Sequence, residues 1–118
     1  MSAEPLLTDL DRRTIAVSKA LAADAVEKAG SGHPGTPISL ASVAWLLYQR
    51  EMVHDPLDPG WLGRDRFVLS IGHASLVQYI QLFLAGYDID LSGFTAFRSP
   101  AGLPGHPEFG EVAGVETT

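Results

Sequence analysis

Only one segment of this chain has the composition of a buried β-strand, and this restricts the folds that are open to it. Residues 66–70 read RFVLS and lie between segments whose apolar residues recur at helical spacing. Helices before and after one buried strand are typical of a parallel sheet, whose other strands are reached through crossover helices. We therefore predict an α/β fold: the N-terminal part of a parallel-sheet domain, mostly helical, with one clear strand in residues 1–118.

The first helical segment is marked by a capping pattern at its start and by a glycine at its end. Thr8 is followed three residues later by Asp11, a spacing at which each side chain can bind the other's backbone amide. Gly30 suits a helix stop, because glycine adopts the left-handed conformation at little cost. The helix is predicted to run to Ala29. Its spacing places four side chains on a shared face: Ile15, Lys19, Ala22 and Val26.

Apolar residues at helical spacing predict three further helices, at residues 37–52, 76–85 and 90–97. Pro37 suits the first position of a helix, where no amide hydrogen is needed, and Thr36 precedes it. Gly86 is the expected stop of the next helix, and Asp90 is a candidate cap for the last. Segments rich in proline and glycine are predicted to be loops, at residues 54–60 and 99–118.

Length and composition bound the kind of protein. The 118 residues suit one small domain or one piece of a larger one. The net charge of -6 argues against nucleic acid or an anionic membrane as a general partner, and the lack of cysteine excludes disulfides and thiolate metal sites. The N-terminus lacks a signal-peptide pattern, and the longest apolar stretch, at residues 40–48, is about half the length of a membrane span. We expect a soluble, cytoplasmic protein.

Three of the four histidines follow a glycine at a predicted turn: His33, His73 and His106. Histidine can donate or accept a proton near neutral pH, and glycine lets the backbone approach a ligand closely. One such pair most often only lines a turn, but three in one short chain favour an active site. His54 has no glycine beside it and is interpreted as an exposed loop residue.

The junction between the predicted strand and the helix after it is a candidate phosphate or diphosphate site. A helix that opens after a glycine turn directs free backbone amides and the positive end of its dipole at that turn. His73 and Ser75 add side-chain donors there. The junction alone supports equally well a plain helix cap at Ser75 and a surface role for His73. No pair of side chains has the spacing of a metal site.

The turns at His33 and His106 have similar alternatives. Prolines and glycines fix the backbone around His33 and suit the presentation of an acid–base group, whereas the alternative is a histidine that caps carbonyls of the first helix. Glu108 follows His106 by two residues, where its carboxylate could orient a ligand or repel it.

The motifs around these histidines together resemble those of transketolases. Residues 28–35 (KAGSGHPG) are similar to the family's N-terminal motif, and residues 64–70 (RDRFVLS) with 72–75 (GHAS) are similar to the next. Residues 104–108 (PGHPE) and 114–118 (GVETT) are similar to the one after that. The resemblance covers residues 12–118. It implies that residues 1–118 are part of the N-terminal, thiamine-diphosphate-binding domain.

The resemblance also implies an activity and partners. Transketolases transfer a two-carbon ketol unit between sugar phosphates in the pentose phosphate pathway. They use thiamine diphosphate with Mg²⁺ at the interface of a homodimer. His33 would lie over the reactive thiazolium ring and assist proton transfer, and His106 would bind a hydroxyl of the two-carbon fragment. His73 would contact the cofactor near its diphosphate, and Thr36 stands where the family has a small residue against the cofactor.

Two departures from the family pattern affect these expectations. Residues 99–103 differ from the polar stretch that usually precedes the third motif and are about one residue shorter. The chain ends at Thr118, before the family's glycine-rich loop, its Gly-Asp-Gly…Asn magnesium motif and the glutamate of its second domain. The metal ligands are therefore expected outside this chain, which would need the remainder of the enzyme and be inactive alone.

Proteins with other functions could carry the same motifs. A dihydroxyacetone synthase or a transketolase split into separate subunits would carry the same motifs. In a different class, the chain could be a non-catalytic remnant or a helical interaction module that keeps ancestral motifs.

Overall fold

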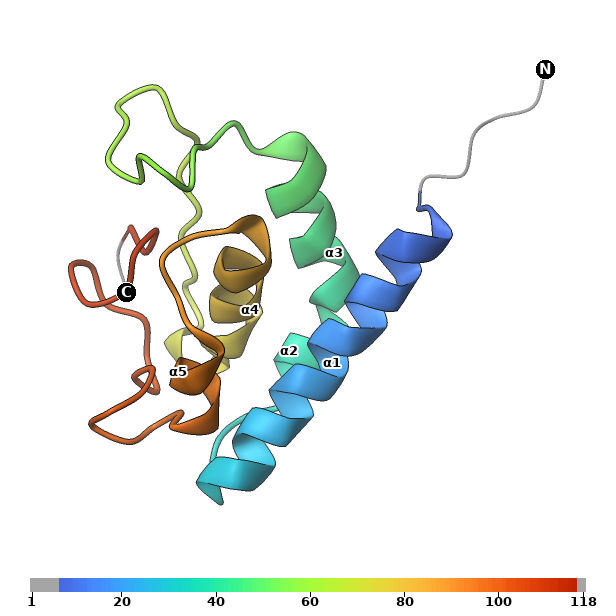
Figure 1. The fold of residues 1–118 in the computed structure, drawn as a ribbon, viewed down its shortest axis with the longest axis vertical. Helices are drawn as coiled ribbons and strands as arrows, with labels where there is room; N and C mark the ends of the chain where they lie inside the picture. Colours follow the sequence, from blue (N-terminus) through green and yellow to red (C-terminus); the bar gives the residue numbers. More distant parts are fainter. Residues whose placement is uncertain (1–6, 117–118) are drawn as a thin grey trace.

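A long helix lies along one side of the molecule and the C-terminal loop along the other, with a shorter helix between them (Figure 1). The computed structural model describes residues 7–116. Its α-helices are α1 (Asp9–Ala29), α2 (Gly35–Ser39), α3 (Ala41–Leu46), α4 (Leu76–Ala85) and α5 (Leu91–Thr95). A π-helical turn (Leu47–Glu51) follows α3, and a 3-10 turn (Gly72–Ala74) precedes α4.

The predicted ends of the first helix are confirmed. The Thr8 hydroxyl accepts from the Asp11 amide, and the Asp11 carboxylate accepts from the Thr8 amide, as a capping box requires. Gly30 ends α1 in the left-handed conformation (φ 72°). The predicted face is partly wrong, because Lys19 is exposed. The buried stripe of α1 contains Ile15, Ser18, Ala22 and Ala25.

The second predicted helix is divided into shorter pieces. It begins at Gly35, two residues earlier than expected, and Leu40 leaves the helical conformation (φ -99°, ψ 6°) between α2 and α3. It ends as a π-helical turn in which the Met52 amide donates to the Leu47 carbonyl (2.8 Å). The third predicted helix is confirmed as α4, with Gly86 left-handed at its end (φ 97°). The last predicted helix is shorter than expected, because α5 ends at Thr95.

The prediction of one clear strand is wrong for the residues that the structure describes. Residues 66–70 run extended, with Leu69 buried and Val68 exposed, which is the side-chain alternation of a strand. Within residues 7–116, however, no backbone hydrogen bond joins this segment to another. A strand is defined by its pairing, and no neighbouring segment supplies the second half of a ladder. The fold described here is therefore helical.

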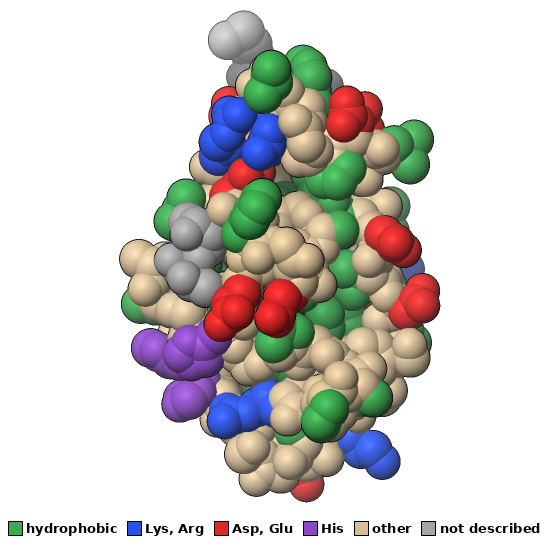
Figure 2. Space-filling view, turned by 90° about the vertical axis from the view of Figure 1, so that its left-hand side faces the viewer, with side chains coloured by type: hydrophobic (Ala, Val, Ile, Leu, Met, Phe, Trp, Pro, Cys, Tyr) green, Lys and Arg blue, Asp and Glu red, His purple; other side chains and the backbone are tan. Residues whose placement is uncertain are grey.

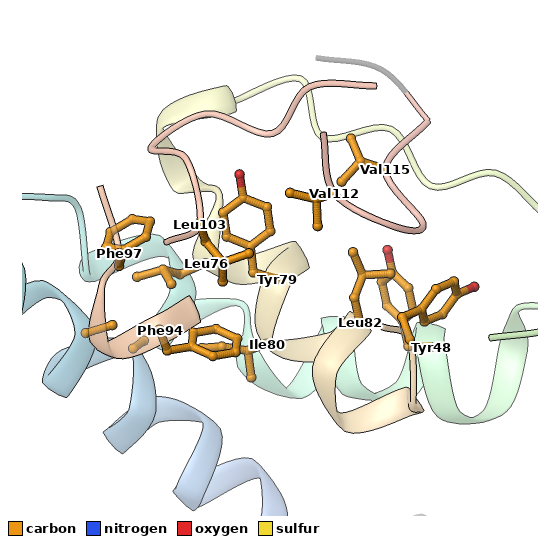
Figure 3. Close-up of a cluster of buried hydrophobic side chains, with 13 residues drawn as sticks. Tyr48, Leu76, Tyr79, Ile80, Leu82, Phe94, Phe97, Leu103, Val112 and Val115 are labelled. Atoms are coloured by element: carbon orange, nitrogen blue, oxygen red, sulfur yellow. The ribbon is translucent and has the colours of Figure 1, made fainter. Parts of the chain in front are cut away.

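Helix α4 forms the centre of the core. Each residue from Leu76 to Leu82 is buried, because α1 and α3 pack on one side of α4 and the C-terminal loop covers the other (Figures 1 and 3). The buried cluster around α4 draws on α1, the π-helical turn, α5 and the C-terminal loop: Ala22, Ala25, Tyr48, Leu76, Tyr79, Ile80, Leu82, Tyr87, Phe94, Phe97, Leu103, Val112 and Val115. A helix that is buried on all sides packs against several segments at once. No helix within residues 7–116 is long and apolar enough to cross a bilayer.

Candidate functional site

The three Gly-His turns, which lie far apart in the sequence, come together in space. The ring centroids of His33 and His73 are 4.9 Å apart, with the ring planes at 66°. A Cβ atom placed on Gly72 would lie 3.0 Å from Nδ1 of His106, so the His106 ring rests on the turn that carries His73. All three side chains are exposed, and histidines gather at one edge of the surface in Figure 2. The structure thus brings three predicted site residues to one place.

Glycine fixes the position of His33. Gly32 has φ of 135°, a conformation that L side chains rarely adopt. A Cβ atom on Gly32 would also lie 3.1 Å from Cγ2 of Val26 and 3.4 Å from Cε2 of Phe97. The chain can therefore pass close to α1 here, and His33 is presented between the end of α1 and the start of α2.

His73 lies in the 3-10 turn that leads into α4. Ala74 and Ser75, the two residues after it, are completely buried and hold the turn against the core. The Ser75 hydroxyl oxygen is buried without a hydrogen-bond partner among the described residues. Such buried polar atoms are uncommon, and three of the four among the described residues belong to α4 or to the residue before it: Ser75 Oγ, Gln78 Oε1 and Gln81 Oε1.

His106 is held by contacts on either side of it in the chain. The Tyr79 hydroxyl donates to the Pro104 carbonyl (2.7 Å), and Pro107 is fully buried. Arg98 also lies close: a Cβ atom on Gly105 would be 3.6 Å from both Cγ and Nε of Arg98. Sequence reasoning missed Arg98, whose backbone is left-handed (φ 68°). The Arg98 side chain places a positive charge beside the turn that carries His106.

A bidentate ion pair fixes the end of the segment that carries His106. Nε and Nη2 of Arg64 each lie 2.7 Å from a carboxylate oxygen of Glu116, and both side chains are mostly buried. The hydrogen bonds from Arg64 hold the pKa of Glu116 below its ordinary value. This pair joins two segments that are 52 residues apart, which is why the sequence alone did not indicate it.

The interpretation of His54 as an exposed loop residue is wrong. Its side chain is half-buried, with Nε2 2.7 Å from the Tyr48 carbonyl and Nδ1 2.8 Å from the Tyr87 hydroxyl. A carbonyl only accepts, so Nε2 carries the hydrogen and Nδ1 of the neutral ring accepts from Tyr87. These two hydrogen bonds hold the loop of His54 against the core, away from the other three histidines.

One of the predicted site residues, Thr36, makes no direct contact with the histidines. Thr36 is half-buried in α2, three residues after His33, and no hydrogen bond joins its side chain to the three histidines. Within residues 7–116, no three histidine or carboxylate side chains converge as ligands of a metal ion. The cluster is therefore a set of exposed proton donors and acceptors at the start of a helix.

Comparison with known proteins gives consistent matches. A family model described as the thiamine diphosphate binding domain of transketolase matches residues 10–118. A chromosomal transketolase of Cupriavidus necator is 56% identical over 99 residues, which cover 83% of this chain and 15% of that protein. A transketolase of Mycobacterium tuberculosis is 54% identical over 112 residues, which cover 94% of this chain and 16% of that protein. The chain thus spans about one-sixth of the length of these relatives.

Solved structures match the fold as well. A transketolase of Pichia stipitis, in complex with sedoheptulose-7-phosphate, superposes with a TM-score of 0.89 at 42% identity, covering 94% of this chain and 17% of that one. A transketolase of Campylobacter jejuni superposes with a TM-score of 0.86 at 40% identity, covering 93% of this chain and 17% of that one. The helical arrangement described above is therefore the one that these enzymes share over this segment.

Proposed function

Because this chain belongs to the transketolase family, matched through the thiamine diphosphate binding domain, we propose that it is part of a ketol-transferring enzyme. The reaction would move a two-carbon ketol unit from a ketose phosphate to an aldose phosphate. One observation carries the proposal: His33, His73 and His106 meet at the start of α4. The sugar-phosphate complex of the Pichia stipitis transketolase supports the substrate class.

The residues present fit a thiamine diphosphate group at this position. The start of a helix of ten residues presents amide hydrogens and a positive dipole end, which suit a diphosphate. The Ser75 hydroxyl, buried there without a partner, marks a polar environment that the described residues leave incomplete. When bound, the cofactor would supply the electron sink that ketol transfer needs. His73, exposed at the same turn, would hold the diphosphate end, and Thr36 would lie against the cofactor.

His33 and His106 would then move and hold protons on the substrate. His33 is exposed beside His73, so its ring can reach a hydroxyl of a sugar that enters over the turn. His106 rests over Gly72 and would donate a hydrogen bond to the hydroxyl of the two-carbon fragment. Two histidines on separate turns can act on two different oxygens of one substrate without competing for the same position.

The rest of the proposal concerns the metal ion, the domain and the assembly of the protein. The ligands of Mg²⁺ would come from elsewhere in the protein. Residues 1–118 would form the first part of the diphosphate-binding domain. We further propose a cytoplasmic homodimer, as the family resemblance implies, with the remainder of the enzyme completing the site.

An assay of the full-length protein that carries this sequence tests the proposal. The protein would be incubated with sedoheptulose-7-phosphate, an aldose phosphate, thiamine diphosphate and Mg²⁺, and the products analysed by mass spectrometry. We expect one sugar to lose two carbons and the other to gain them, only when the cofactor is present. A folded protein that binds no cofactor and converts neither sugar would favour a non-catalytic remnant instead.

A further inference from the structure

The hydroxyl of Tyr79 makes a contact that the proposed chemistry does not use. Tyr79 lies in α4 and is completely buried, and its ring stands between Leu103 and Val112 with the hydroxyl directed at the C-terminal loop (Figure 3). The hydroxyl donates to the Pro104 carbonyl at 2.7 Å. Burial, with Glu111 and Glu108 nearby, raises the pKa of Tyr79 above its ordinary value, so the hydroxyl keeps its proton and stays a donor.

The bond fixes a short segment with little freedom of its own. Proline at 104 and at 107 restricts the backbone on either side of Gly105 and His106. Pro107 is fully buried, so the segment is anchored after His106 by packing and before it by the Tyr79 hydroxyl. Between these two points the His106 side chain alone is exposed.

The same helix sets the position of the other histidines. The turn of Gly72–Ala74 leads directly into α4, so His73 and Tyr79 belong to one rigid element. His106 lies on this turn, with Nδ1 3.0 Å from the position that a Cβ atom on Gly72 would take. Within residues 7–116, the bond from the Tyr79 hydroxyl is the one side-chain hydrogen bond found between α4 and the segment that carries His106.

We propose that Tyr79 is a positioning residue, whose hydroxyl holds the Pro104 carbonyl and thereby sets where His106 stands relative to His73 and His33. The proposal rests on the proposed function for its kinetic consequence, but its structural consequence is independent of it. Loss of the bond would let the segment shift between its proline anchors. A displacement of about 1 Å in a catalytic group can lower the rate by up to about 100-fold.

The test is Tyr79→Phe in the full-length protein, with Tyr87→Phe as the matched control. Both changes remove one hydroxyl that makes one short hydrogen bond, but Tyr87 binds His54, away from the site. We expect Tyr79→Phe to lower kcat by about 10-fold to 100-fold, with the cofactor Kd within about twofold of the wild type. Tyr87→Phe should keep kcat within about twofold.

A spectroscopic measurement separates positioning from general stability. With histidine labelled at ¹³Cε1, Tyr79→Phe should shift the NMR signal of His106 and leave that of His54 in place, whereas Tyr87→Phe should do the reverse. p-Aminophenylalanine at position 79 keeps a donor and should restore kcat to within about threefold. If Tyr79→Phe does not fold, p-fluorophenylalanine at position 79 takes its place, because fluorine fills part of the space of the hydroxyl but cannot donate a hydrogen bond.

Each outcome can be interpreted. Wild-type kcat and an unmoved His106 signal in Tyr79→Phe would overturn the proposal, as would equal losses in the phenylalanine and p-aminophenylalanine variants. If the wild-type enzyme itself transfers no ketol unit, the proposed function fails, whereas the His106 signal still decides whether Tyr79 positions that residue.

Discussion

The absence of a side chain at Gly72 determines how closely two of the histidine turns can approach. The His106 ring occupies the space that a Cβ atom at this position would need, with 3.0 Å between Nδ1 and that atom. The backbone of Gly72 does not have a positive φ, so the conformation itself would accept another residue. What the site requires here is space and not backbone freedom.

Replacement of Gly72 by alanine should therefore affect activity more than stability. The exposed His106 ring can move aside by a few tenths of an ångström, so we expect the free energy of unfolding to change by less than about 1 kcal/mol. We expect kcat to fall by about 10-fold, because the displaced ring would move away from the substrate hydroxyl that we propose it binds. Steady-state kinetics and a thermal melt of the full-length variant measure the two effects.

Gly60→Ala is the control for this change, because a Cβ atom on Gly60 would meet nothing within 4 Å. It should leave both quantities as in the wild type. An unchanged kcat in Gly72→Ala would show that the contact between the turns has no role in catalysis.

The roles proposed for His33 and His73 should separate in kinetics. If His33 moves protons, His33→Ala should lower kcat by about 10²–10⁴-fold even with saturating cofactor. If His73 mainly holds the cofactor, His73→Ala should raise the cofactor concentration needed for half-maximal rate, with activity partly restored at saturation. Titration of both variants with thiamine diphosphate provides the comparison. Equal losses that the cofactor rescues in both would show that the roles are misassigned.

At the scale of elements, local signals predicted helix ends well and missed features that depend on distant residues. Thr8, Gly30 and Gly86 act within one turn of the chain, and the structure confirms each helix end that they predicted. His54 was misread because its partner Tyr87 lies 33 residues away. The prediction of a strand at residues 66–70 is wrong because a short apolar run indicates an extended, buried chain but does not reveal whether a partner is present.

In the candidate site, too, local features were predicted from the sequence and features that depend on distant residues were not. The glycine before each histidine marked His33, His73 and His106 from the sequence, since close backbone approach is a local property. That these turns meet, and that Arg98 and Tyr79 lie beside the third, follows from packing around α4, which no local pattern encodes.

The ion pair between Arg64 and Glu116 should give the C-terminal segment a pH-dependent stability. The pKa of Glu116 is lowered in the fold, so its stabilising effect is present above the ordinary value of 4.5 and is lost as the pH falls through the lowered value. At pH 7, Glu116→Gln should speed hydrogen exchange at the Val115 amide, which donates to the Val112 carbonyl, by about fivefold. The difference from the wild type should vanish in strong acid.

Wild type and variant would be compared at each pH by amide exchange, so that intrinsic exchange rates cancel. Glu111→Gln is the control, because Glu111 lies in the same segment and no ion pair is found for it among the described residues. A difference that persists undiminished in strong acid would show that Glu116 acts through packing and not through its charge.

At the scale of the whole molecule, the extended segment at residues 66–70 is the main weakness of the described fold. Its backbone groups have no partners within residues 7–116, and such groups cost about 1–3 kcal/mol each when buried. Leu69 is the buried residue of the segment, so the cost falls mainly on its backbone groups and offsets a part of the ~5–15 kcal/mol by which domains are typically stable. A neighbouring strand from the rest of the protein would remove this cost.

We therefore expect residues 1–118, produced alone, to be helical but loosely packed or self-associating, with no tight binding of magnesium and thiamine diphosphate. Circular dichroism during a thermal melt, sedimentation of the same sample and calorimetric titration with the cofactor measure these properties. The full-length protein serves as the positive control. A sharp two-state melt from a clean monomer, or sub-micromolar binding that depends on Mg²⁺, would contradict the expectation.

The loop between α3 and the 3-10 turn has a practical consequence. In Figure 1 it extends from the end of the molecule opposite the turn between α1 and α2, and Leu57 and Leu62 in it are 92% and 85% exposed. Exposed loop tips tolerate insertions. Since residues 1–118 contain no cysteine, Leu57→Cys would add a single thiol to this segment at a distance from His33, His73 and His106. A fluorophore attached there could report how this segment moves relative to the rest of the enzyme while leaving the chemistry untouched.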